Sequence, residues 1–547
     1  MKPSPAKIGL LLGLLLLVIL SEHLTLNRMF VVDEFQNVFT ARLLATHQAG
    51  NFMSSANLLI LGPMTWIAGA FEHAAPMMRA ERVLFFLLFW LNLALIVRCA
   101  GFRLRSQAGA LALLFAATFA VFWHYGFEIR HDNPLLTMVL LAWLAARPLQ
   151  EGARRRPFLV GLFAVIAQFL AFKAFVYTVP IVLFTIVAAW WFDRRPLWRV
   201  VVDIGGGALV ALAGCRAIYF ASGTWTIFAT STQGLAAAAV HRVQRMNPLP
   251  VFIQFVIESP ILIAGMLIGA VLTIRRWNWR ELVSRDSLAP EAAFCLSGIV
   301  ALLANPSPFP YNLVIPTAQA VVLFLRLRPW QWLSKPVLAA LAAVHVGIWL
   351  YFTSRHYVMT NERQTEVMTI AEQMTDPQSN RVLDGVGMVT TRLPPNYFWL
   401  LTFITLPSFH SGELAPMRSE LAKGQTPVII PNYRVFSLPR ADHEFIGQHY
   451  VPLSGDYLVA GGRFTRAGVS SWECLVPGRY YVTAQPHKPQ VTIDGASHPA
   501  GVMTMTRGAH RIDVPPGDIV WIIWLGPTLT EPPDLGPGNT RIVVTFS

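Results

Sequence analysis

The chain has 547 residues, of which 54% are hydrophobic and 13% charged, with a mean hydropathy of +0.48. Soluble domains carry about twice that charged fraction, and the apolar residues here form long unbroken runs, which excludes a single large soluble core and indicates membrane helices. The net charge is +13, but the basic residues form short clusters between apolar runs, which favours membrane lipids and argues against nucleic acid as a partner.

The first apolar run covers residues 8–20 and continues to Leu26. Its length is typical of a cleaved signal peptide, but no small-x-small cleavage site follows it. We therefore predict a retained helix whose N-terminus lies in the cytoplasm.

A pair of adjacent carboxylates, Asp33 and Glu34, follows this helix. The next apolar side chains recur at helical spacing, which predicts a helix lying in the membrane interface; they are Phe35, Val38, Phe39 and Leu43. Residues 58–71 are apolar but interrupted by Gly62 and Pro63. This segment is short for a span, so we favour a re-entrant piece.

Further apolar runs predict membrane helices at residues 83–97, 108–123, 135–146, 158–172, 174–192, 200–220, 251–274, 292–304, 311–325 and 337–352. With the first helix they make about eleven to thirteen spans. We therefore predict a mainly α fold, a polytopic helix bundle over residues 1–353.

Arginine and lysine fall in every second loop between these runs, and such loops stay in the cytoplasm. They include Arg98, Arg103, Arg105, Arg147, Arg194, Arg195, Arg275, Arg276, Arg326, Arg328 and Lys335. The acidic stretches, Lys173 and the tail are therefore predicted to lie together on the opposite face.

The tail, residues 354–547, is predicted to form an α/β and antiparallel β domain on that same face. Residues 361–374 have the pattern of an amphipathic helix, and residues 427–430 and 434–436 that of short strands. Further on, Gly and Pro turns separate alternating strands at residues 479–482, 490–495, 510–514 and 519–525.

Asp33 and Glu34 allow two interpretations. An acid at a helix start caps backbone N–H groups and suits the positive end of the helix dipole. A carboxylate at the membrane edge can also act as a general base toward a hydroxyl group. Both hold at once if the cap fixes the carboxylate in place.

A second charged stretch contains Glu128, Arg130, His131 and Asp132. One interpretation is a solvated turn that caps a helix beginning near Pro134. Charges at a helix mouth in a membrane protein are otherwise candidates for function. These side chains are close enough in sequence to form a polar network with Asp33.

Lys173 interrupts a nearly continuous apolar stretch. A lysine that snorkels from a helix end is the ordinary explanation, but a cation at the membrane edge is also suited to hold a phosphate. Arg82 and Arg242 are weaker candidates for the same task, as are Arg79 and Arg245. The four cysteines and the histidines have no metal-ligand spacing, so the sequence assigns no metal site and no cofactor.

Taken together, these motifs resemble those of the GT-C superfamily of polyprenyl-phosphate-sugar glycosyltransferases. The nearest types are protein O-mannosyltransferases and the bacterial lipid A aminoarabinose transferase. Asp33-Glu34 matches the Asp-Glu motif of the first loop, and Arg130-His131-Asp132 matches the Arg-x-Asp motif. Lys173 with Pro180 matches the Lys-Gly…Pro helix start, with alanine in place of the glycine. The arginine that many relatives carry before a tyrosine such as Tyr311 is absent.

The resemblance implies transfer of a sugar from a polyprenyl phosphate to an acceptor hydroxyl, with inversion, at an active site that faces the periplasm of a bacterial inner membrane together with the C-terminal domain. Asp33 is then the general base, with Glu34 or Asp132 as alternatives. Arg130 and Asp132 orient the acceptor or the base, and Lys173 holds the donor phosphate. The substrate-binding set also includes Glu128, His131, Arg82, Arg242 and Tyr311. Relatives differ in their use of a divalent metal, so that question stays open.

Two other functions compete with this interpretation. A transporter or flippase of lipid-linked substrates places its charges near the bilayer midplane and often has internal repeats, whereas these charges lie at one edge. A non-catalytic envelope protein with a glycan-binding β tail would tolerate the loss of Asp33. For an enzyme, we expect a lipid or envelope glycan as acceptor rather than a protein.

Overall fold

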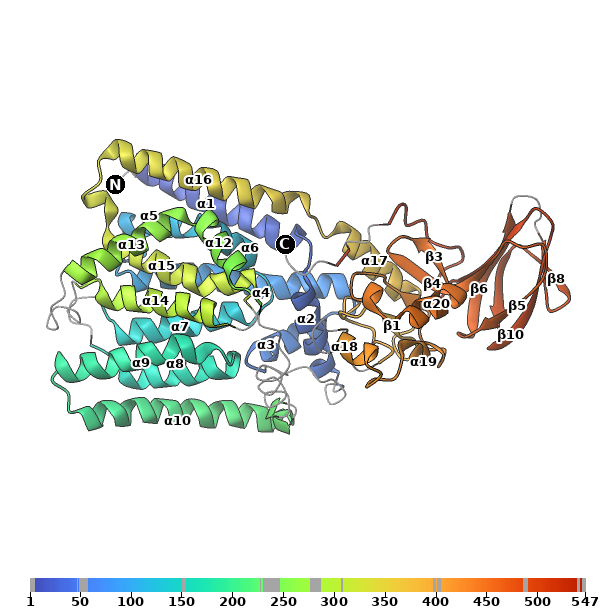
Figure 1. Ribbon diagram of the computed structural model, residues 1–547, viewed down its shortest axis with the longest axis horizontal. Helices are drawn as coiled ribbons and strands as arrows, with labels where there is room; N and C mark the ends of the chain where they lie inside the picture. The colour runs from blue at the N-terminus through green and yellow to red at the C-terminus, as the bar shows by residue number, and fades with distance from the viewer. Residues whose placement is uncertain are drawn as a thin grey trace.

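The computed structural model describes residues 5–46, 48, 58–149, 154–226, 228–229, 246–275, 287–305, 308–396, 400, 405–485, 490–538 and 542–543. Two parts lie end to end along the long axis of the molecule (Figure 1). One is a bundle of helices and the other is a mixed α/β and β part formed by the C-terminal third of the chain.

Among the described residues, six helical segments are long and apolar enough to cross a membrane. They are α1 (Pro5–Asn27), α4 (Ala74–Cys99), α9 (Ala174–Trp191), α10 (Leu197–Ala221), α16 (Lys335–Val358) and the run Pro310–Gln331, which holds η2 (Pro310–Leu313), α15 (Val314–Leu327) and η3 (Pro329–Gln331). Shorter helices of the bundle are α2 (Val32–Ala45), α3 (Leu58–Ala70), α5 (Gln107–Ala117), α6 (Ala120–Tyr125), α7 (Asp132–Ala146), α8 (Pro157–Leu170), α12 (Leu249–Glu258), α13 (Pro260–Arg275) and α14 (Ala289–Ala304). The larger predicted number of spans stays a prediction.

The outer helices of the bundle expose apolar side chains. Leu11 on α1 is 63% exposed and Leu209 on α10 is 67% exposed. Large exposed tryptophans also gather where α9 leads into α10 and α15 into α16; they are Trp190, Trp191, Trp198, Trp330 and Trp332. Apolar flanks with tryptophan at the helix ends are typical of a lipid-embedded bundle. The chain is therefore a multi-pass membrane protein.

Two predicted helices are broken in the structure. Residues 108–123 form α5 and α6 with an interruption at Thr118, whose Oγ1 donates to the Phe115 carbonyl at 2.8 Å. Residues 251–274 form α12 and α13, which meet at Ser259 with a bend of 97°. The bend follows from Pro260, which lacks the N–H that would continue the helix.

The C-terminal part has helices α17 (Glu362–Gln373), α18 (Thr405–His410), α19 (Met417–Leu421) and α20 (Arg440–His449). One sheet has the strand order β1-β2-β4-β11-β6-β9, with β3 paired to β4, and a second has the order β5-β10-β7-β8. The strands are β1 (Val382–Leu383), β2 (Val428–Ile429), β3 (Tyr450–Ser454), β4 (Tyr457–Phe464), β5 (Gly468–Cys474), β6 (Gly478–Gln485), β7 (Gln490–Ile493), β8 (Ala496–Pro499), β9 (Gly501–Met505), β10 (Gly508–Val514) and β11 (Ile519–Trp524). The predicted β-rich tail is confirmed.

One predicted strand, at residues 434–436, is wrong. Val435–Ser437 form the 3-10 helix η4 instead. The side chain of Asn432 causes the turn, because its Oδ1 accepts the backbone N–H of Arg434 at 3.0 Å. Such side-chain bonds compete with strand pairing.

The two parts share one hydrophobic core, and the predicted division after residue 353 falls in the last turns of α16. Phe30, Phe35 and Met77 belong to the same cluster as Val386 and Met388. Polar contacts reinforce this packing. The Phe30 backbone N–H donates to Gln364 Oε1 at 2.7 Å, and Gln364 Nε2 donates to the Phe30 carbonyl at 2.9 Å. Helix α17 is thus docked directly on the loop that leads to Asp33.

Candidate active site

The candidate residues from the sequence converge at the end of the bundle that meets the C-terminal part. Asp33 lies in the first turn of α2, Asp132 begins α7, and Lys173 is the N-cap residue of α9. In Figure 1, α2 lies at the junction with the C-terminal part. Helix starts collect at this end because successive membrane helices alternate in direction, and their positive dipole ends favour the carboxylates.

Asp33 and Arg130 form the ion pair at the centre of the site, and of the two only Asp33 is accessible. Arg130 Nη2 lies 2.5 Å from Asp33 Oδ2. The Arg130 side chain is 2% exposed, whereas that of Asp33 is 36% exposed. The guanidinium also covers the ring of Tyr311, with its carbon 3.3 Å from the ring centre. The buried guanidinium therefore holds Asp33 in place, while part of the Asp33 carboxylate stays accessible.

Lys173 forms the second open group. Its Nζ lies 2.5 Å from Asp132 Oδ1 and donates to Asn312 Oδ1 at 2.7 Å. The lysine side chain is 26% exposed, while Asp132 is buried. Nζ also lies 5.6 Å from the centre of the Tyr311 ring. His131, which is partly exposed, has Nε2 3.6 Å from Asp132 Oδ2. Lys173 is thus a fixed and accessible cation.

Glu34 and Arg82 form a buried pair beneath this open layer. All five N–H groups of Arg82 donate within the protein, to the two Glu34 carboxylate oxygens and to backbone carbonyls of residues 25, 28 and 29. Glu34 also accepts the backbone N–H of Val31 at 2.9 Å and of Ile129 at 3.3 Å. This pair joins α2, α4 and the second charged stretch.

The charge state of Glu34 follows from this pairing. Burial disfavours the carboxylate, but the charge and hydrogen bonds of Arg82 outweigh it, so the pKa of Glu34 is held below its ordinary value. Glu34 therefore stays ionised beside Arg82 and acts as the helix cap that the sequence allowed.

Arg28 is a site residue that the sequence interpretation missed. It pairs with Glu128 at 2.6 Å and donates to the His124 carbonyl at 2.6 Å. Glu128 Oε2 in turn lies 3.8 Å from Arg130 Nη1. The sequence signal for this role was an arginine that closely follows the first apolar run and stands five positions before Asp33. Asn312, also missed, had only its place beside Tyr311 as a signal.

The remaining arginine candidates do not join the open layer in the described part of the chain. Arg79 instead contacts α17. Its Nη2 lies 3.3 Å from Thr365 Oγ1 and 3.5 Å from Oδ1 of Asn361, the N-cap residue of that helix. Arg82 is used fully by the buried pair. Arg242 and Arg245 lie outside the described residues.

The acids of the site are neutralised by protein cations. Asp33, Glu128 and Asp132 each lie within ion-pair distance of Arg130. In the residues that the structure describes, no group of three or more His, Cys, Asp or Glu side chains could hold a metal ion. The chemistry available here is that of an accessible carboxylate beside fixed positive charge.

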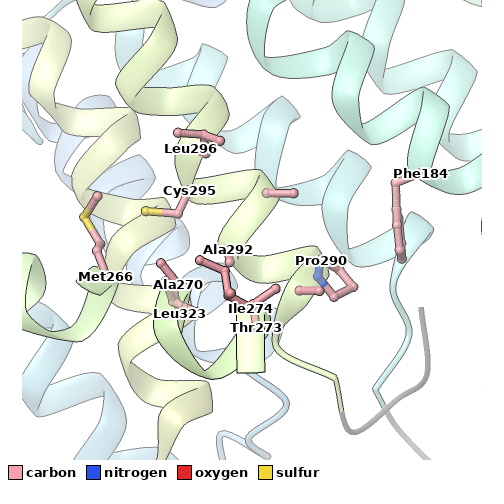
Figure 2. A pocket seen from close by; sticks show the side chains of 12 residues that line it. Phe184, Met266, Ala270, Thr273, Ile274, Pro290, Ala292, Cys295, Leu296 and Leu323 are labelled. Carbon is pink, nitrogen blue, oxygen red and sulfur yellow. The ribbon is translucent and has the colours of Figure 1, made fainter. Parts of the chain in front are cut away.

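A cavity of about 530 Å³ lies elsewhere in the bundle, between α9, α13, α14 and α15 (Figure 2). Its lining includes Phe184, Met266 and Leu296 and is apolar apart from Thr273 and Cys295. It adjoins the start of α14 and the last turn of α13, away from Asp33. Such a lining suits a hydrocarbon chain rather than a sugar or phosphate.

No family model and no curated protein matches the sequence. Among solved structures, the fold is similar to the oligosaccharyltransferase of Archaeoglobus fulgidus. The apo form has a TM-score of 0.45 at 10% identity, covering 93% of this chain and 75% of that chain. The complex with Zn and sulfate has a TM-score of 0.45 at 12% identity, covering 83% and 72%. The form tethered to an acceptor peptide has a TM-score of 0.43 at 10% identity, covering 81% and 72%. Likeness at this level assigns neither a family nor an activity.

Proposed function

We propose that the protein is an integral-membrane glycosyltransferase of the GT-C type, which moves a sugar from a polyprenyl phosphate to an acceptor hydroxyl. The observation that carries the proposal is the presence of two partly exposed groups, the Asp33 carboxylate and the Lys173 ammonium, on either side of the Arg130–Tyr311 stack at one end of a membrane bundle. The motif resemblance at Asp33-Glu34, Arg130-x-Asp132 and Lys173 supports the same conclusion.

In this mechanism, Asp33 accepts the proton of the acceptor hydroxyl as its oxygen attacks the anomeric carbon of the sugar. The bond between that carbon and the phosphate oxygen breaks, and the electron pair leaves with the polyprenyl phosphate. Lys173 neutralises the negative charge on the leaving phosphate. Attack opposite to the leaving group inverts the anomeric centre.

The other polar residues position these two groups. Arg130 holds Asp33 in place, and Asp132 with Asn312 directs Lys173. Glu34 is a poorer base than Asp33, because both of its oxygens already accept hydrogen bonds inside the protein. Arg82 is likewise occupied, so a phosphate would have to displace existing bonds. We assign Glu34, Arg82 and Glu128 to the scaffold, and His131 to the rim of the site.

The alternation of basic loops supports a site that faces the periplasm of a bacterial inner membrane. An acceptor whose head group lies outside the bilayer then meets the donor at the membrane edge. We therefore propose a lipid or an envelope glycan as the acceptor. The flippase alternative has less support, because the charges gather at one end of the bundle.

The test is sugar transfer by the purified full chain in lipid nanodiscs, with undecaprenyl-phosphate hexose as donor and envelope glycolipid as acceptor. We expect Asp33→Asn to abolish turnover while donor binding stays intact. Glu444→Gln, which removes an exposed carboxylate far from the bundle, is the matched control. Equal rates for Asp33→Asn and wild type would remove Asp33 from catalysis. Lipid movement across vesicles without any transfer would identify a flippase.

A further inference from the structure

The apolar cavity between α9, α13, α14 and α15 is suited to a hydrocarbon chain (Figure 2). Small side chains leave the space open, because Ala270 on α13 and Ala292 and Ala293 on α14 line it. The hydroxyl group of Thr273 needs no water there, since its Oγ1 donates to the Gly269 carbonyl at 2.8 Å. A cavity of about 530 Å³ with this lining is dry and takes an apolar ligand.

The cavity opens on the outer surface of the bundle. Ile274 and Leu296 both line it, and their side chains are 68% and 61% exposed. Ala270 and Ala293 are exposed beside them. On a membrane bundle such an apolar surface is in contact with lipid. A lipid chain can therefore enter the cavity directly from the bilayer.

The depth of the cavity fits the upper part of a lipid chain. Phe184, a lining residue, lies roughly 9 Å before Trp190 along α9, at a rise of about 1.5 Å per residue. Trp190 and Trp191 are about half exposed, and tryptophan at a helix end marks the head-group level of a bilayer. Lys173 lies at the other end of α9, roughly 16 Å from Phe184. A lipid in this cavity therefore has its head group at the tryptophan end, away from Asp33 and Lys173.

A cation stands where the head group would lie. Arg275 is exposed in the last turn of α13 and directly follows Ile274, which lines the cavity. Arginine at a membrane surface attracts anionic lipids, and its guanidinium binds phosphate oxygens with parallel N–H groups. This end of the cavity therefore favours a lipid with a negatively charged head group.

A buried ion cluster behind the cavity adds to the positive charge. Glu291 directly follows Pro290, which lines the cavity, and pairs with Arg147. Arg326 Nε lies 3.6 Å from Oε1 of the same carboxylate. Within this cluster two arginines face one glutamate, and a charge in a medium of low dielectric constant acts over a longer distance. The buried Arg147 contributes only its field, and direct contact with a ligand falls to the exposed Arg275.

We propose that the cavity binds an anionic phospholipid of the membrane leaflet farther from Asp33. One acyl chain fills the space between α13 and α14, and the lipid phosphate pairs with Arg275. The polyprenyl donor is a poorer occupant, because its phosphate is proposed to lie at Lys173, at the opposite end of α9. The bound lipid contacts α9, α13 and α14 together and stabilises their packing by mass action. This inference goes beyond the proposed glycosyl transfer and does not depend on it.

Lipid binding to the full chain in detergent tests the inference without any sugar transfer. Delipidated protein is titrated with phosphatidylglycerol or phosphatidylcholine that carry the same acyl chains, and native mass spectrometry counts the bound lipids. We expect wild type to bind one phosphatidylglycerol more tightly than phosphatidylcholine. Arg275→Gln should raise the half-saturating phosphatidylglycerol concentration about tenfold, the effect of one lost hydrogen bond to a charged group. Ala292→Leu should remove the tight site, because the larger side chain fills the cavity.

Two matched controls should bind lipid like wild type. Arg105→Gln removes an exposed arginine between α4 and α5, and Ala213→Leu enlarges an exposed alanine on α10. Wild-type affinity in either Arg275→Gln or Ala292→Leu overturns the inference. Where Ala292→Leu fails to fold, Arg275→Gln decides alone.

Two further results of the same titration would overturn the choice of lipid. Equal affinity of wild type for the two phospholipids overturns the anionic head group. Displacement of phosphatidylglycerol by an equimolar amount of undecaprenyl phosphate overturns the phospholipid and assigns the cavity to the donor chain. Because no step measures transfer, a failure here is distinct from a failure of the proposed enzyme activity.

Discussion

The buried Arg130 holds Asp33 in place, with its Nη2 2.5 Å from the Asp33 carboxylate, and leaves the Asp33 side chain 36% exposed. The same guanidinium lies over Tyr311 and within 3.8 Å of Glu128. Arg130 therefore connects the buried ion pairs to the open layer. A planar cation is needed for this arrangement, because it stacks on a ring with its face while its edge pairs with acids.

Arg130→Lys tests this geometry. The substitution keeps the positive charge but removes the planar guanidinium that fixes Asp33. We therefore expect kcat to fall roughly ten- to hundredfold. The melting temperature should change little, since the ammonium still compensates the acids. Steady-state transfer and thermal unfolding of the same preparations check both statements. A wild-type rate for Arg130→Lys would show that Asp33 needs no such fixation.

Glu34→Gln tests the buried layer. Removing one partner of a buried ion pair leaves the other charge uncompensated, which costs roughly 3–5 kcal/mol. We expect a large drop in the free energy of unfolding for Glu34→Gln and a small one for Asp33→Asn, the exposed neighbour. Unfolding followed in detergent measures the difference. Equal losses for the two variants would contradict the division into scaffold and reactive acid.

The pH dependence of stability follows from the same pair. The pKa of Glu34 is lowered in the folded protein from an ordinary value of 4.5. Its stabilisation is therefore fully present above the unfolded value and is lost as pH falls below it. The melting temperature of wild type should fall on acidification below about pH 4.5. The melting temperature of Glu34→Gln should fall by less over the same pH range. Identical acid sensitivity of the two proteins would show that this pair is not the source.

The convergence of Asp33, Arg130, Asp132 and Lys173 was predictable from the sequence. Charges are rare in apolar runs, so each one is informative, and the alternation of basic loops decides which helix ends meet. The buried face of α2 was also predictable, because Phe35, Val38, Phe39 and Leu43 repeat at helical spacing and are all buried.

The separate roles of Asp33 and Glu34 were not predictable. Adjacent residues on a helix differ by about 100° in direction, and only the distant Arg82 determines which one turns inward. The contact of Gln364 with Phe30 joins residues 334 positions apart and has no local signal. The turn after β2 was missed for a related reason: residues 434–436 follow a strand-like pattern, and the side chain of Asn432 overrides it.

Lys173→Met tests the donor side of the site. Hydrogen bonds to charged groups contribute roughly 1.5–3 kcal/mol, so we expect the Kd for undecaprenyl phosphate to rise about ten- to hundredfold. Direct binding to nanodisc-embedded protein measures it without catalysis. Lys423→Met, at a side chain 62% exposed in the C-terminal part, controls for loss of positive charge. Unchanged affinity in Lys173→Met would assign the phosphate to another cation.

Gly207→Ala tests how the helices α8 and α10 pack. A Cβ at Gly207 would lie 1.9 Å from the Phe158 carbonyl oxygen, and one at Gly161 would lie 2.0 Å from that of Ile204, so the two backbones touch. Small residues permit such close packing in membranes. We expect Gly207→Ala to lower the free energy of unfolding by about 1–3 kcal/mol. Gly205→Ala, two positions away with nothing within 4 Å, should be neutral or stabilising because alanine favours helix. Unfolding of both variants in the same detergent compares them, and equal stability would mean that α8 and α10 separate at no cost.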